Sequence, residues 1–167
     1  IKLTENNLGA SGNNNPNQII LAEEIFIIPL EPAYNENTTD TSLGTVGVAI
    51  NGIPIYNPFE DQNETAAYGR IFSSCCGHPQ LNGIYHYHKY PTCLRYIDGD
   101  NFKTEKEKCD GIDQLIENGN HSPLIGFALD GWPIYGPVGW TDETRNSKLL
   151  SSSYTGLSDS SGNPVFI

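Results

Sequence analysis

Three of the four histidines of this 167-residue chain lie close together in one short stretch. In an extended segment alternate side chains share a face, so His86 and His88 should project side by side while Tyr85 and Tyr87 point the other way. His78 lies on the far side of a glycine-containing turn and can fold back over the pair. The stretch therefore predicts three imidazoles gathered on one face of a β-ribbon.

Gathered imidazoles can bind a metal ion, because histidine is the commonest protein ligand for transition metals. The candidate ligands are His78, His86 and His88, with His121 and Asp130 as further candidates. The sequence does not require a cofactor. The candidate metal ions for these ligands are divalent zinc, copper and calcium. A zinc ion with three protein ligands keeps an open position for water, and Asp130 could then act as a general base.

The competing interpretation is structural. The tyrosines would pack in the core, and the histidines would hydrogen-bond to the backbone and to acidic loops. Asp130 is then explained by the preference of Asp-Gly for turns. The residues favour this interpretation, so we assign no catalytic residue and regard an enzymatic role as the less favoured one.

Composition and charge limit the classes of function. The chain has the length of one domain, 37% hydrophobic residues and a formal net charge of -11. Such a charge repels nucleic acid and anionic lipid and attracts cations. No apolar run approaches the roughly 20 residues that span a bilayer, so we expect neither a nucleic-acid partner nor a membrane span.

Several features indicate export. The chain begins with Ile1 and contains no methionine, so we expect that a signal peptide has been removed. Its four cysteines include no Cys-x-x-Cys pair and predict two disulfides, for which three connectivities exist. Sequons for N-glycosylation occur at Asn37, Asn63 and Asn120. We therefore expect a secreted or cell-surface glycoprotein.

The N-terminal part divides into two pieces. Residues 1–17 are rich in Asn, Ser and Gly and are predicted to be a flexible or strand-exchanging segment. Residues 18–30 are apolar and β-branched, which predicts strands of the main domain, ended by Pro29 and Pro32. We expect residues 18–167 to form one domain, with strand exchange between subunits as the alternative for this apolar run.

An internal repeat supplies the clearest structural signal. Residues 47–58 align without gaps with residues 126–137, with identical Gly, Ala, Gly, Pro, Ile, Tyr and Pro. Each copy has Asn-Gly or Asp-Gly between apolar runs, which predicts a β-hairpin with a two-residue turn and positive φ at both turn residues. The proline two residues later predicts that the second strand of each hairpin is an edge strand or carries a bulge there.

These patterns predict a mainly β fold: a single domain with two related hairpins, short helices near residues 64–68 and 110–119, long loops and disulfide cross-links. The two hairpins could pair about a pseudo-twofold axis or lie in separate sheets.

With the histidine stretch and both repeats taken together, the chain resembles the YHYH-domain family. The resemblance rests on residues 46–58, 76–80, 83–88 and 121–137, and it extends from about residue 44 to 140. It implies that Cys76 pairs with Cys93, which leaves Cys75 to pair with Cys109. It implies no particular activity.

The expected function is that of an extracellular structural or adhesive, ligand-binding glycoprotein module. Such a module could associate end to end into a filament through its terminal strands, so the expected partners are other copies of the chain or extracellular matrix and glycan. The alternative is a secreted metal-dependent enzyme or metal-binding protein that uses the clustered histidines.

Overall fold

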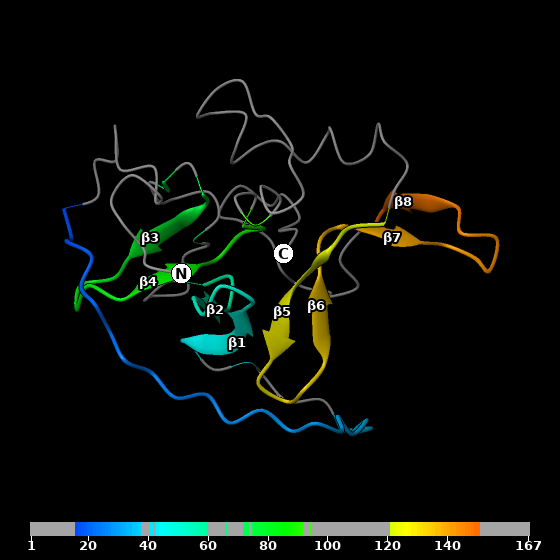
Figure 1. Cartoon of the computed structure of the whole chain (residues 1–167), viewed down its shortest axis with the longest axis horizontal. Coiled ribbons are helices and arrows are strands. Elements are labelled where there is room, and N and C mark those ends of the chain that lie inside the picture. Colours follow the sequence, from blue (N-terminus) through cyan, green and yellow to red (C-terminus); the bar gives the residue numbers. More distant parts are fainter. Residues whose placement is uncertain are drawn as a thin grey trace.

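A computed structural model describes residues 16–37, 41, 43–59, 66, 72–73, 75–91, 94 and 121–150. The strands are β1 (Thr45–Ala49), β2 (Pro54–Tyr56), β3 (Gly77–Pro79), β4 (Tyr85–Tyr87), β5 (Leu124–Ala128), β6 (Pro133–Tyr135), β7 (Val138–Trp140) and β8 (Ser147–Leu149). Among the described residues they form a six-stranded sheet, in the order β3-β4-β2-β1-β5-β6, and a two-stranded sheet of β7 and β8 (Figure 1). The prediction of a mainly β fold is confirmed.

The two repeats form the centre of the larger sheet. Each copy is an antiparallel hairpin, β1–β2 and β5–β6, and the two hairpins pair through their first strands. Val48 lies opposite Phe127, its equivalent in the other copy, and Gly47 and Ala49 lie opposite Ala128 and Gly126. This register is what a local twofold axis between β1 and β5 produces, so the two hairpins share one sheet.

The hairpin turns differ from the prediction in length. In the first hairpin the N–H of Ala49 donates to the carbonyl of Ile53, and the N–H of Gly52 donates to the carbonyl of Ala49. The second hairpin repeats both bonds among Ala128, Trp132 and Gly131. These are three-residue loops, in which only the final glycine needs a positive φ. Gly52 and Gly131 have φ of +83° and +96°, whereas Asn51 and Asp130 are not in the positive-φ region, so the expected two-residue turn was wrong.

The expectation that the proline marks an edge strand or a bulge is confirmed for the second hairpin and wrong for the first. Strand β6 is an edge of the sheet, as Pro133 predicted. Strand β2 is interior, because it pairs with β1 on one side and with β4 on the other, where Ile55 lies opposite Tyr87 in parallel orientation. The register shift in this hairpin lies on β1 and not at Pro54. Pro54 is tolerated because it is the first residue of its strand.

The apolar N-terminal run is not part of either sheet. Residues 16–37 contain no strand, so the predicted strands at residues 18–30 were wrong. We call residues 18–30 the N-terminal arm. The arm is extended and runs along one side of the large sheet, from the β3–β4 turn to the β5–β6 turn (Figure 1). The Ile20 N–H donates to the Gly83 carbonyl at 3.0 Å, and the Pro29 carbonyl lies beside Gly131.

The hydrophobic core is formed where β1, the first hairpin turn and β5 meet the tyrosines of β4. It is built from Ala49, Ile53, Tyr85, Tyr87, Leu94 and Ile125. The Tyr87 hydroxyl accepts a 3.0 Å hydrogen bond from Asn51 Nδ2. The first hairpin turn is thereby tied to β4 by a polar contact as well as by packing.

Other expectations fall mostly outside the described residues. Ala66 is helical, but the rest of residues 64–68 and all of residues 110–119 are not described. The same is true of residues 1–15, so the boundary expected between residues 17 and 18 stays a prediction. Cys75 and Cys76 are each in the disulfide-bonded state. Their expected partners, Cys93 and Cys109, lie outside the described residues, so the pairing also stays a prediction. In the described part no helix is long and apolar enough to cross a membrane.

The first prediction concerns the pairing of β1 with β5. A Cβ at Gly126 would collide with the Val48 carbonyl oxygen, and one at Gly47 would lie 2.8 Å from the Phe127 carbonyl oxygen. Gly126→Ala should therefore lower the free energy of unfolding by about 1–3 kcal/mol, the usual cost of overpacking. Gly52→Asn is the control, because nothing lies near its Cβ and Asn tolerates positive φ. Equal effects of the two substitutions in urea unfolding would contradict the pairing.

The second prediction concerns alkaline pH. Burial raises the pKa of Tyr87 from 10.0 to about 12. Between these values the unfolded phenol loses its proton while the folded one keeps it, so stability is lost as the pH rises, by about 3 kcal/mol from this group. Tyr87→Phe should be less stable at neutral pH, having lost the Asn51 contact, but should lose less stability on going to high pH. If the unmodified protein and Tyr87→Phe lose equal amounts of stability between neutral and high pH, Tyr87 does not ionise on unfolding.

Candidate functional site

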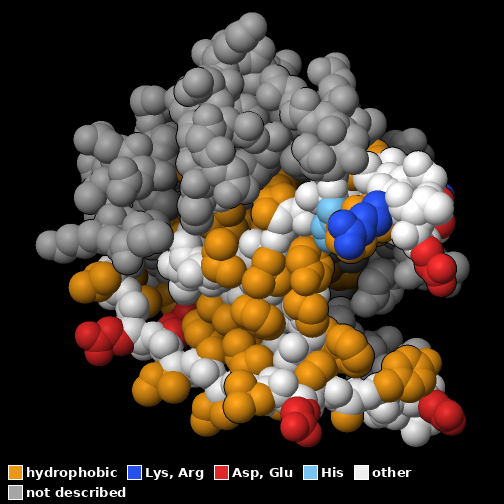
Figure 2. Space-filling model, turned by 45° about the vertical axis from the view of Figure 1, so that its right-hand side comes forward, with side chains coloured by type: hydrophobic (Ala, Val, Ile, Leu, Met, Phe, Trp, Pro, Cys, Tyr) orange, Lys and Arg blue, Asp and Glu red, His pale blue; other side chains and the backbone are white. Residues whose placement is uncertain are grey.

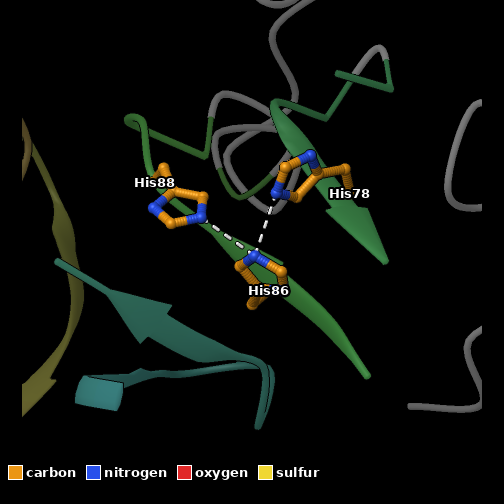
Figure 3. A group of neighbouring side chains, drawn as sticks. All are labelled: His78, His86 and His88. Atoms are coloured by element: carbon orange, nitrogen blue, oxygen red, sulfur yellow. Dashed lines mark hydrogen bonds between the residues drawn. The ribbon is translucent and has the colours of Figure 1, made fainter. Parts of the chain in front are cut away.

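The histidine stretch forms a ribbon at one edge of the large sheet. Strands β3 and β4 are antiparallel, and His78 lies directly opposite His86. His88 follows β4 immediately and is on the same side of the chain as His86. Tyr85 and Tyr87 point to the core, as the alternation predicted. Figure 3 shows the three rings turned toward one another, with His86 between the other two.

The three imidazoles are almost completely removed from solvent. The exposed fractions are 4% for His78, 1% for His86 and 5% for His88. His86 Nε2 lies 2.9 Å from His78 Nε2 and 2.9 Å from His88 Nε2. One ring nitrogen of each histidine lies within 4.8 Å of those of the other two, a grouping that can hold a metal ion. The expected convergence of these three residues is therefore present in the structure.

Backbone carbonyls hold the outer nitrogens of two rings. His86 Nδ1 lies 3.1 Å from the Ile84 carbonyl oxygen, and His88 Nδ1 lies 2.5 Å from the Asn57 carbonyl oxygen. A carbonyl oxygen only accepts hydrogen bonds, so each Nδ1 carries the proton and donates it. In the neutral rings each Nε2 then presents a lone pair to the shared centre. Burial lowers the pKa of His86 to about 4, which keeps this ring neutral at physiological pH.

Aromatic side chains enclose the cluster. The Tyr56 ring stacks on His86, with centroids 4.1 Å apart and planes inclined by 20°, and meets His88 edge-on. Its hydroxyl accepts a 3.1 Å hydrogen bond from Gln80 Nε2. Phe72 covers His78, with centroids 5.1 Å apart. These contacts fix the orientation of the rings.

Sequence reasoning missed Tyr56, although the repeat held a clue. Its equivalent in the second copy, Tyr135, also packs against a histidine: the ring of His121 meets it edge-on at 5.2 Å. The tyrosine of each repeat thus lies beside an imidazole supplied by a segment outside the hairpins. No sequence pattern could have predicted the contact of the Asn57 carbonyl with His88, because every residue has a backbone carbonyl oxygen.

The two further ligand candidates are not near the cluster. His121 packs against Tyr135 and Trp140, and Asp130 is exposed on the β5–β6 turn. Three strand spacings separate β4 from β5, or roughly 14 Å. Among the described residues, the only group of histidine, cysteine, aspartate and glutamate side chains with metal-ligand spacing is the His78, His86 and His88 set.

The remaining site residues are distributed over the chain. Asn37, the first residue of a sequon, is exposed. Asn63 and Asn120 lie outside the described residues, and glycosylation at all three sites stays a prediction.

Fold and site together define a β-rich domain in which a duplicated hairpin supports a ribbon of buried histidines. Residues 25–165 match the sequence model of the YHYH protein family. The chain belongs to this family. Comparisons with curated proteins and with solved structures gave no significant match.

The third prediction concerns the tautomers. At neutral pH, His86 and His88 should both carry a proton on Nδ1, because the Ile84 and Asn57 carbonyls accept it. Long-range proton–nitrogen correlation spectra distinguish the two neutral forms of each ring. A proton on Nε2 of either residue would show that the carbonyl contacts do not exist in solution.

Proposed function

We propose that this YHYH-family chain is a secreted structural or adhesive module that associates with copies of itself end to end through its N-terminal arm. One observation carries the proposal: the arm presents large apolar side chains to solvent while lying outside both sheets.

The exposed area on the arm is large. Leu21, Ile25, Ile27 and Leu30 are exposed to 95%, 90%, 89% and 99%. Burying a Leu or Ile side chain is worth about 1.5–3 kcal/mol, so covering these four would release about 6–12 kcal/mol before the costs of association. A micromolar complex has a binding free energy of about 8 kcal/mol. Association itself costs about 4–15 kcal/mol, so the arm supplies a large part of the driving force and further contacts must supply the rest.

The arm also has the pattern of a strand without a neighbouring strand. Ile25 and Ile27 are exposed, while Phe26 and Ile28 between them are partly buried. This period of two is that of a β-strand. Within the part of the chain that the structure describes, the backbone–backbone hydrogen bond of residues 18–30 is that of Ile20 with Gly83. The backbone between Leu21 and Leu30 is thus able to pair with a strand of another chain.

Charge indicates how copies would join. Glu23 and Glu24 lie in the middle of the arm. Two arms paired antiparallel with each other would bring these residues face to face, and like charges opposite one another destabilise strand pairing. The arm is better matched to a different surface of the next copy. Such a head-to-tail contact, when it does not close into a ring, produces a filament.

The large sheet offers an apolar surface that could receive an arm. The half-exposed hydrophobic side chains on and beside the two hairpins include those of Ile50, Phe127, Leu129 and Trp132. Figure 2 shows hydrophobic side chains gathered over the middle of one face, with acidic side chains at its rim.

Secretion rests on separate support. The disulfide-bonded state of Cys75 and Cys76 fits an oxidising compartment, and the exposed Asn37 is accessible to glycosylation. A secreted enzyme is the less supported candidate, because the histidines are almost fully buried and Asp130 lies on a distant turn. Nothing in the described part places a general base beside them.

The fourth prediction tests the arm. The double substitution Ile25→Ser and Ile27→Ser should abolish self-association, measured by analytical ultracentrifugation over a range of concentrations. The control is Leu81→Ser, which removes a side chain 92% exposed on the β3–β4 turn and not on the arm. Because the chain carries a net charge of -11, added salt should strengthen the association of the unmodified protein.

Two results would overturn the proposal. One is a strictly monomeric unmodified protein at the highest attainable concentration. The other is equal loss of association in the arm variant and the Leu81 variant, which would point to non-specific hydrophobic contact.

A further inference from the structure

Three neutral imidazole rings cannot by themselves account for the contacts at the centre of the histidine cluster. His86 Nε2 carries a lone pair and no proton, because the proton is on Nδ1, and the same holds for His88. Their 2.9 Å contact therefore places two lone pairs against each other. His78 can relieve one side by donating a hydrogen bond to His86 Nε2, but it cannot relieve the contact between His86 and His88. In a buried site this contact needs a positive species between the nitrogens.

A proton and a metal ion are the two species that fit. A shared proton would place an imidazolium in a site from which water is excluded, which is costly without a counter-charge. The ligand-spaced group in the described part of the chain consists of three imidazoles, each of which offers one nitrogen. A metal ion is stabilised by the lone pairs themselves, so it removes the conflict without a carboxylate.

We propose that His78, His86 and His88 bind one divalent transition-metal ion through their Nε2 atoms. This inference is independent of self-association, because the arm supplies none of the three ligands.

The donor set selects the class of metal. Three imidazole nitrogens suit zinc, copper, nickel or cobalt, whereas calcium takes oxygen ligands, so calcium is dropped from the candidates. Zinc–nitrogen bonds are about 2.0–2.1 Å long, which puts two nitrogens about 3.3 Å apart in a tetrahedron and about 2.9 Å apart at a right angle. The 2.9 Å separations fit right-angled positions directly and fit a tetrahedron after shifts of a few tenths of an ångström.

The surroundings have the features of a metal site. Bound imidazoles usually donate their other N–H to a carbonyl or carboxylate, which fixes the ring. The Ile84 and Asn57 carbonyls do this for His86 and His88. Tyr56 stacks against His86 and restricts its rotation. Burial of all three rings indicates a tightly held ion that links β3 to β4 and, through Asn57, to the end of β2.

The fifth prediction is tested on the full chain without a histidine tag. Elemental analysis should find one transition-metal ion per chain in material purified without chelator. After chelation, titration with zinc alone or cobalt alone should restore one equivalent. The melting temperature should rise with the concentration of either metal and should not respond to calcium. Cobalt should also give visible absorption bands of a nitrogen-ligated ion.

His86→Gln removes the central ligand and should weaken zinc binding about 100-fold or more. His121→Gln is the matched control, since His121 lies outside the cluster, and it should bind as the unmodified chain does. The Ile25→Ser and Ile27→Ser variant should retain full binding even if it no longer associates, which separates failure of this proposal from failure of self-association.

Absence of a cobalt spectrum and of zinc binding in the unmodified chain would overturn the proposal, whether or not the variants fold. Binding that His121→Gln weakens as much as His86→Gln does would also overturn it. If His86→Gln does not fold, the nitrogen spectra of the unmodified chain test the assignment of the ligands. Zinc must shift the Nε2 resonances of His86 and His88, and unchanged resonances would contradict the assignment.

Discussion

The close approach of β1 to β5 is the constraint on which the other elements depend. Gly47 and Gly126 are equivalent residues of the two repeats, and each lies where a side chain would strike the backbone of the opposite copy. This contact joins the two hairpins into one sheet around a local twofold axis. It also leaves one side of β2 open, and β4 pairs there. The histidine ribbon is thus placed at the edge of a sheet whose centre is the duplicated hairpin.

From that position the ribbon uses both of its faces. The tyrosines of β4 enter the core, and Asn51 from the first hairpin turn bonds to the hydroxyl of Tyr87. The histidines on the other face converge, and the chain just after β2 supplies the Asn57 carbonyl that orients His88. Core packing and ring orientation therefore depend on the same strand pairing. The N-terminal arm contacts the β3–β4 turn at Gly83 and lies beside the β5–β6 turn at Gly131.

Sequence patterns predicted what depends on local geometry and failed where distant partners decide. Alternation placed Tyr87 and His86 on opposite faces, and the aligned repeats predicted two hairpins. The turn length was missed because Asn-Gly and Asp-Gly also suit a three-residue loop in which glycine alone needs positive φ. The interior position of β2 depends on its pairing with β4, which no local pattern near Pro54 reports. The apolar arm is rich in β-branched residues, yet residues 16–37 contain no strand, because a strand forms only where a neighbouring strand pairs with it.

An electron cryomicroscopy map of the purified protein, prepared at high concentration without chelator, tests the central claim most directly. The account predicts subunits joined head to tail, with residues 18–30 of each one covered by its neighbour's sheet. Isolated particles in which the arm packs against its own domain would contradict it.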